Sequence, residues 1–103
     1  MSNSVNLALI GASGVVGKKI LKVIENKKIP IDNFYPIGNS SVGSEVFLNN
    51  EKYTISDLDS FDRSKINIAI FSAGSKVARK YAQLFVDENI YVIDMSSEFR
   101  YQE

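Results

Sequence analysis

The sequence predicts an α/β fold built on a mostly parallel sheet with helices on both faces. Short apolar stretches at 5–10, 66–73 and 90–94 are typical of buried strands. Two stretches with helical periodicity, from 15 to about 27 and from 76 to 89, separate them. Strands that alternate with helices require right-handed crossovers, which set neighbouring strands parallel. The expected architecture is Rossmann-like and incomplete at the C-terminus, because the last strands of a full dinucleotide fold are missing.

The first strand and the first helix meet at a glycine. The strand VNLALI, at 5–10, ends at Gly11. The helix has lysines on one side, and Asn26, the Lys27–Lys28 pair and Pro30 end it. The residues of its apolar stripe are Val16, Ile20, Val23 and Ile24.

The middle of the chain predicts a second strand and a small hairpin. NFYPIG, at 33–38, is the strand, and Pro36 is expected to place it at a sheet edge or to end it early. The stretch at 45–55 predicts a hairpin, because both asparagines at 49–50 accept the positive φ of a tight turn. The polar stretch at 56–65 is expected to contain a short helical turn.

The composition is that of one globular domain. Of 103 residues, 45% are hydrophobic and 23% are charged, and twelve basic residues balance twelve acidic ones. With no net charge, neither a nucleic acid nor an anionic membrane is an expected partner. The N-terminal stretch has neither a basic n-region nor a long apolar run, so we expect no signal peptide, no membrane span and a cytoplasmic location.

The 103 residues contain neither cysteine nor histidine. The chain therefore has no thiolate for a nucleophile or a metal site, and it lacks the commonest general base. We expect no catalytic residue and no metal ligand within it.

Three glycines spaced three apart lie where the first strand turns into the first helix. Gly11 permits the tight turn, Gly14 lets a pyrophosphate approach the backbone, and Gly17 lets the helix pack closely on the strand. The helix N-terminus then offers free amides to an anion. These amides belong to the residues around Gly14, namely Ser13, Val15 and Val16. The alternative is a tight turn that binds nothing.

The end of the second strand bears on the choice of nucleotide. An NAD site usually has an acidic residue there, which binds the ribose 2′-hydroxyl. This chain instead has Gly38 and Asn39, followed by Ser40 and Ser41. Neutral donors without an acid favour NADP, and the alternative is a solvated polar loop.

Two further segments are expected at the same sheet edge. Ser72, Ala73 and Gly74 end the central strand, where small residues leave room for a ligand across the backbone or simply make a turn. Arg100 follows the last strand, and it is either a surface charge or a bidentate ligand for a phosphate or carboxylate.

Taken together, the motifs GASGVVG (11–17), FSAG (71–74) and VIDMSSEFR (92–100) resemble the N-terminal NADP-binding domain of aspartate-semialdehyde dehydrogenase. The resemblance extends over essentially the whole chain. N-acetyl-γ-glutamyl-phosphate reductase, a relative with a similar glycine loop, fits FSAG and SSEFR less well. A free-standing nucleotide-binding module without chemistry and a nucleotide-free scaffold are also compatible with the pattern.

The resemblance implies NADPH-dependent reductive dephosphorylation of L-aspartyl-4-phosphate to aspartate semialdehyde, a step towards lysine (by way of diaminopimelate), methionine and threonine. In the family, a cysteine forms a thioester, hydride from the nicotinamide reduces it, and a histidine assists. The resemblance assigns the 2′-phosphate to Ser40 and Ser41 and the substrate phosphate to Arg100. It also implies a full-length homodimer or homotetramer.

The chain departs from the family pattern at several positions. Ser40 replaces the arginine of many bacterial members, Ser75 replaces a second glycine after FSAG, and Met95 replaces an asparagine. The catalytic cysteine, the histidine and the dimerisation domain are absent. Residues 1–103 are therefore expected to be a cofactor-binding fragment that is inactive alone.

Overall fold

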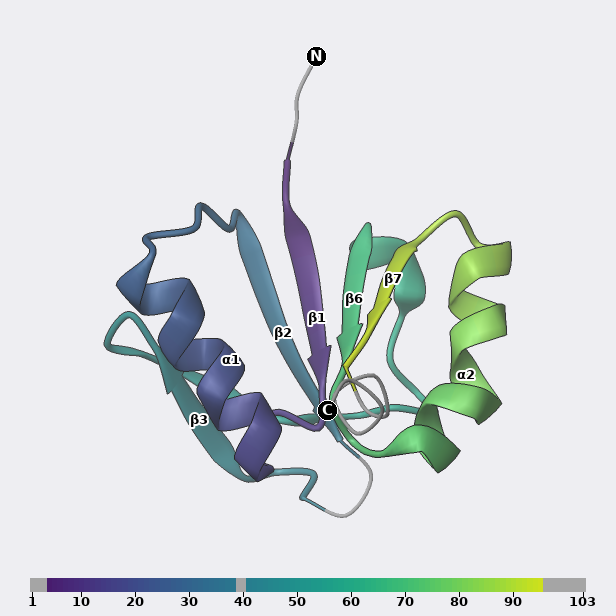
Figure 1. The fold of residues 1–103 in the computed structure, drawn as a ribbon, viewed down its shortest axis with the longest axis horizontal. Helices are drawn as coiled ribbons and strands as arrows, with labels where there is room; N and C mark the ends of the chain where they lie inside the picture. The colour runs from purple at the N-terminus through teal and green to yellow at the C-terminus, as the bar shows by residue number, and fades with distance from the viewer. Residues whose placement is uncertain (1–3, 39–40, 96–103) are drawn as a thin grey trace, which may run out of the picture.

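A five-stranded parallel sheet forms the centre of the computed structural model, which describes residues 4–38 and 41–95 (Figure 1). Its strand order is β5-β2-β1-β6-β7, so the chain crosses over at β1. Leu9 of β1 pairs with Pro36 on one side and with Ile70 on the other. The strands are β1 (Asn6–Ile10), β2 (Asn33–Gly38), β5 (Ser56–Asp57), β6 (Ile68–Phe71) and β7 (Tyr91–Asp94).

The two helices cover opposite faces of the sheet, as the alternation of β1 dictates. Leu7 and Leu9 pack with helix α1 (Val15–Asn26), whereas Ala8 and Ile10 pack with helix α2 (Ser75–Asp87). A hairpin of β3 (Glu45–Leu48) and β4 (Glu51–Thr54) adds to the α1 layer. The predicted Rossmann-like fold is confirmed. Among the described residues, no helix is long and apolar enough to span a membrane.

The hairpin turn is as predicted. Asn49 and Asn50 have φ angles of 54° and 68°, the left-handed pair that a two-residue turn between twisted strands needs. Val46 and Leu48 of the hairpin are buried against the α1 face, and Phe47 between them is exposed.

Pro36 does not end β2, so the expected early end is wrong, whereas the alternative, an edge, holds locally at this residue. β2 continues to Gly38, and β5 pairs only with Ile37 and Gly38. At residue 36 the side of β2 away from β1 therefore has no ladder partner, and a missing N–H is tolerated there. The two-residue strand β5 was not predicted, because SDLDSF is polar and has no strand periodicity.

The predicted helical turn is the 3₁₀ helix η1 (Arg63–Lys65), capped by the Asp62 side chain, which accepts the Ser64 N–H. Arg63 donates two hydrogen bonds to Glu88, of 2.9 and 2.8 Å, and its guanidinium lies 5.8 Å from the ring centroid of Phe85. This pair fixes the loop before β6 to the end of α2.

Candidate cofactor site

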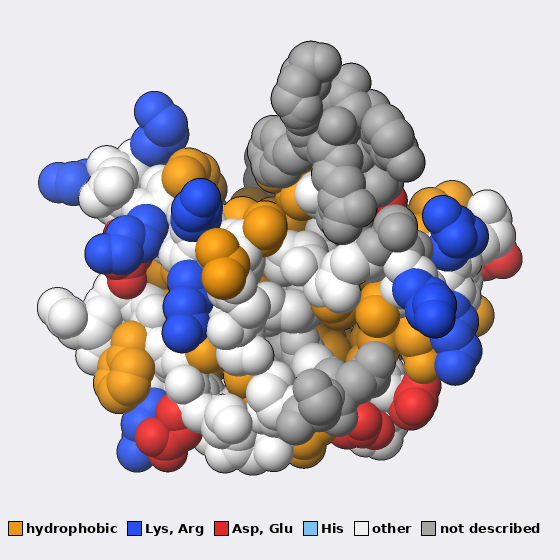
Figure 2. Space-filling model, turned by 60° about the horizontal axis from the view of Figure 1, so that its bottom comes forward, with side chains coloured by type: hydrophobic (Ala, Val, Ile, Leu, Met, Phe, Trp, Pro, Cys, Tyr) orange, Lys and Arg blue, Asp and Glu red, His pale blue; other side chains and the backbone are white. Residues whose placement is uncertain are grey.

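A cleft of about 400 Å³ lies at the carboxyl ends of the strands, where open α/β sheets bind ligands. Figure 2 views this edge of the molecule and shows a hollow between the α1 and α2 sides. The loop after β1, the loop after β6 and the end of β2 form the walls. The lining residues are small or apolar: Ile10, Gly11, Ser13, Gly14, Gly38, Ser41, Ser72, Ala73 and Val77.

Gly11 holds the loops after β1 and β6 together. Its φ is +90°, and a Cβ at this position would lie 2.8 Å from the backbone of Ala73. The Gly11 N–H donates to the Ile37 carbonyl at 2.8 Å, which fixes the loop to β2 as well. Glycine is required here by both conformation and space within the chain.

Gly17 allows α1 to pack on the loop that precedes it. A Cβ at Gly17 would lie 2.2 Å from the carbonyl oxygen of Gly11 and 2.9 Å from the Cα of Ala12. The predicted role of this third glycine, close packing of helix and strand, agrees with that geometry.

Gly14 differs from the other two glycines. Its φ of −79° suits any residue, and a Cβ here would meet only the Gly11 oxygen, at an ordinary 3.5 Å. Gly14 is exposed and lines the cleft. Nothing in the described part of the chain requires glycine at this position, so the space it leaves is available to a ligand.

The amides at the start of α1 are free to bind an anion. Gly14 is the N-cap of α1 and has no side chain to accept from them. In the described structure the N–H groups of Val15 and Val16 have no acceptor, and the first intrahelical bond runs from Lys18 to Gly14. Such amides bind phosphate, aided by the helix dipole.

A serine pair closes one side of the cleft. The hydroxyl oxygens of Ser13 and Ser41 are 3.0 Å apart and hydrogen-bonded. Gly38 makes room for this pair, because a Cβ there would lie 2.9 Å from the Ser41 Oγ. The loops after β1 and β2 thus meet through neutral hydroxyl groups.

One carboxylate lies near the end of β2. Asp57 of β5 is in register with Gly38, but its side chain accepts the Ser60 N–H at 3.2 Å. Asp57 is not among the residues that line the cleft.

The predicted site residues divide into three groups. Gly11, Ser13, Gly14, Ser41, Ser72 and Ala73 line the cleft. Val15, Val16, Gly17 and Gly74 adjoin it without lining it, and Gly74 has the positive φ of a turn, 113°. Ser40 and Arg100 lie outside the described residues.

The β6 end also has a structural contact. Ser72 donates its hydroxyl to the Ile10 carbonyl at 2.8 Å, so this side chain joins β6 to β1. Sequence reasoning missed Ile10, Gly38 and Val77 as lining residues. Only the position of Gly38 before the polar loop could have indicated it.

No ionisable side chain lines the cleft in the described structure. Two side chains with shifted pKa values are not among the lining residues. A hydrogen bond to Asp59 raises the pKa of Tyr81, and one from Arg63 lowers the pKa of Glu88. No three acidic residues converge as a metal site in the described ranges. The described lining of the cleft consists of glycine, apolar and serine residues.

Residues 6–103 match the family described as semialdehyde dehydrogenase, NAD binding domain. The chain belongs to this family. Among members named aspartate-semialdehyde dehydrogenase, that of Legionella pneumophila is 40% identical over 104 residues, covering all of this chain and 30% of the relative. That of Rickettsia bellii is 39% identical, covering all of this chain and 31% of the relative.

Solved structures of the same family superimpose closely. The chain aligns with aspartate semialdehyde dehydrogenase II from Vibrio cholerae, complexed with ASA, at a TM-score of 0.87 and 32% identity. The alignment covers 97% of this chain and 33% of that structure. The chain thus spans about a third of the length of these semialdehyde dehydrogenases.

Proposed function

We propose that the cleft binds NADP(H) and that the chain is the cofactor-binding part of an aspartate-semialdehyde dehydrogenase. The enzyme would reductively dephosphorylate L-aspartyl-4-phosphate to the semialdehyde, with hydride supplied by the bound cofactor. The 103 residues hold and orient the cofactor, and the thiol that the reaction needs is not among them. The name shared by the relatives supports this substrate over the N-acetyl-γ-glutamyl-phosphate alternative.

The observation that carries the proposal is the contrast between Gly14 and its two neighbouring glycines. Gly11 and Gly17 are required by the fold, whereas Gly14 leaves open space beside free helix amides. A pyrophosphate fits that combination, because it needs both close approach to the backbone and unpaired N–H donors.

The surroundings of the β2 end favour NADP over NAD. A 2′-phosphate placed there would meet the hydroxyl groups of Ser13 and Ser41 and no lining carboxylate. Asp57 is the acid in register with the end of β2, and it is directed to the Ser60 amide. An NAD-type contact from Asp57 to a ribose hydroxyl is the competing arrangement.

Titration of the 103-residue chain with NADP and NAD by calorimetry tests the cofactor assignment. We expect the chain to bind NADP more tightly than NAD. Ser41→Ala should lower the affinity for NADP, and Asp57→Asn should leave it unchanged. Preference for NAD together with weaker NAD binding by Asp57→Asn would overturn the NADP assignment. Absence of binding to either dinucleotide would overturn the site itself.

A chimaera tests the reaction. Residues 1–103 replace the matched third of the Legionella relative, and NADPH formation from aspartate semialdehyde, phosphate and NADP is followed at steady state. We expect activity, and we expect Arg100→Ala to raise the KM for phosphate more than it lowers kcat. A folded but inactive chimaera would contradict the assignment to this reaction.

A further inference from the structure

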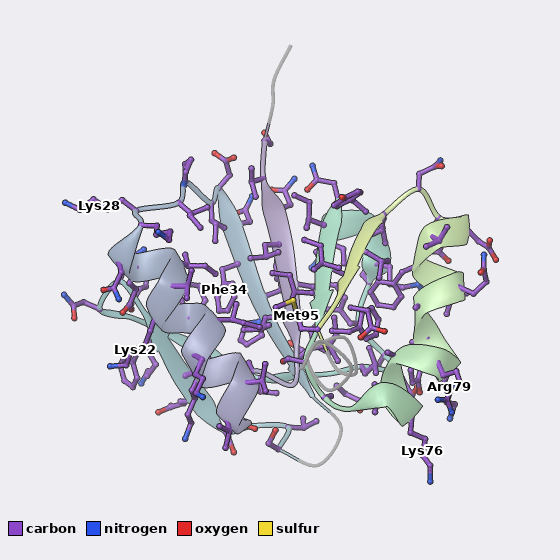
Figure 3. The ribbon with its side chains drawn as sticks, in the orientation of Figure 1. Lys22, Lys28, Phe34, Lys76, Arg79 and Met95 are labelled. Carbon is purple, nitrogen blue, oxygen red and sulfur yellow. The ribbon has the colours of Figure 1, made fainter. Side chains whose placement is uncertain are left out.

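Both helices carry positive charge on exposed side chains, α2 in its first half and α1 from its fourth to its eighth residue. Lys18, Lys19 and Lys22 are exposed on α1, and Lys76, Arg79 and Lys80 are exposed on α2. The backbone N–H of Lys18 donates to the carbonyl of Gly14, a lining residue, at 2.9 Å. Lys76 is next in sequence to Val77, another lining residue. Figure 3 shows Lys76 and Arg79 at the N-terminal end of α2 and Lys22 on α1.

This placement is unfavourable for the helices themselves. Neither helix has an acidic residue in its first turn or a basic residue in its last turn, so neither has the charges that the helix dipole prefers within those turns, although Lys27 is the C-cap of α1. Lys18 and Lys22 form a like-charge pair four residues apart, and Lys76 and Lys80 form another. Like charges at that spacing destabilise a helix. Helix stability therefore does not explain the pattern.

The six cations are also largely unneutralised. Among the described residues, the salt bridges Lys52–Glu45 and Arg63–Glu88 involve none of them. Lys80 lies over the ring of Tyr81 at 5.3 Å, which leaves its charge in place. Figure 2 shows the blue side chains gathered over α1 on one side of the hollow and over α2 on the other.

Acidic groups also lie near this edge and keep their charge. Asp57 accepts the Ser60 N–H and Asp59 accepts the Tyr81 hydroxyl, and among the described residues neither forms a salt bridge with one of the six cations. The opposite end of the sheet has both signs close together, as with Arg63 and Glu88. Since the whole chain has zero net charge, any attraction for an anion must come from this uneven distribution.

We infer that the six cations form two positive flanks which draw polyphosphate ligands to the cleft and accelerate their association. The inference rests on the proposed function for the identity of the ligand, the dinucleotide. Charges at the rim of a site change the association rate and its salt dependence more than they change the dissociation rate. NADP, with its additional phosphate, gains more from the flanks than NAD.

Relaxation of backbone amides by charged nitroxides measures the field without any cofactor. In the 103-residue chain, we expect an anionic nitroxide to broaden the amides of Gly14 and Ala73 more than a cationic one. The triple substitutions K18Q/K19Q/K22Q and K76Q/R79Q/K80Q should each reduce that difference. Equal broadening by the two probes in the unsubstituted chain would overturn the inference, whether or not NADP binds.

Stopped-flow binding of NADPH then tests the kinetic effect. Each triple variant should lower the association rate at low salt by on the order of tenfold, with little change in dissociation. The difference should vanish near 1 M salt, where the screening length is about 3 Å. The matched control K27Q/K28Q/K65Q removes the same charge at the other end of the sheet.

The outcomes separate the two proposals. An equal decrease of the NADPH association rate in the control variant would mean that only net charge matters, and it would overturn the inference about the two flanks. No NADPH binding by the unsubstituted chain would refute the proposed function, while the nitroxide result would still decide the inference. The midpoint of thermal unfolding should be unchanged or higher in the two flank variants, because each removes a like-charge pair.

Discussion

Substitution of Gly17 by alanine tests the contact between α1 and the glycine loop. The new Cβ would lie 2.2 Å from the Gly11 oxygen, and ordinary contact begins at 3.4 Å, so loop or helix must move by about 1.2 Å (3.4 − 2.2). Overpacking of this kind costs about 1–3 kcal/mol. At an ordinary helix position the same substitution stabilises by about 1 kcal/mol.

Taking the upper part of that range, we expect a net loss of about 2 kcal/mol in the free energy of unfolding. For a domain of this size, that lowers the midpoint by roughly 8–16 °C. Urea titration followed by circular dichroism gives the free energy, and a thermal scan gives the midpoint. A Cβ at Gly14 would also face the Gly11 oxygen, but at an ordinary 3.5 Å, so a substitution of Gly14 is the matched control.

Gly14→Asn is that control. Asparagine is a good N-cap, so stability should be unchanged or higher by a few tenths of a kcal/mol. Its side-chain oxygen can accept from the first-turn amides and fill the open space, so NADP affinity should fall by about tenfold or more. Stability of Gly17→Ala equal to that of the unsubstituted chain would refute the close packing of α1 on the loop. Unchanged affinity in Gly14→Asn would refute the ligand role of Gly14.

Three further predictions concern the fold. Phe85→Ala, which removes a fully buried ring 5.2 Å from that of Phe71, should cost about 3–5 kcal/mol in urea unfolding; a loss below about 1 kcal/mol would contradict the packing. Asn50→Ala should cost about 1 kcal/mol at its φ of 68°, and Asn50→Gly should not; equal stability of the two would argue against the left-handed turn. The bonds from Arg63 lower the pKa of Glu88, so their stabilisation is present above the unfolded carboxyl pKa and is lost as pH falls through the folded one. Between about pH 7 and pH 3, Glu88→Gln should therefore flatten the loss of thermal stability, and an unchanged slope would count against this pair.

A local sequence pattern was sufficient to predict the helices, strands and turns whose residues show one. The periodicity of α1, the apolar strand β1 and the Asn49–Asn50 turn each carry their information within a few residues, and the elements form as predicted. Within α1 the predicted apolar stripe is wrong at Val23, which is 47% exposed, because the helix buries Leu21 instead. β5 has no such pattern. Its two residues become a strand because β2 offers a free edge beyond Pro36, which is a tertiary effect.

The cleft was only partly predictable for the same reason. Gly11 and Gly14 stand next to the strand end, so motif and topology placed them together. Val77 reaches the cleft because α2 begins at the same sheet edge, and Ile10 because the loop opens beside it. The different roles of the three glycines are visible only when the atoms that a Cβ would meet are known.

The most direct test of the site is an amide NMR titration of the chain with NADP. We predict the largest shift changes at Ser13, Val15 and Val16, with a second group at Ala73, because a pyrophosphate would take the free N–H groups of the α1 start. Another cavity, of about 190 Å³, lies beside the hairpin and is lined by residues that include Ile31 and Asn49. Saturable changes confined to those residues would contradict a dinucleotide site at the glycine loop.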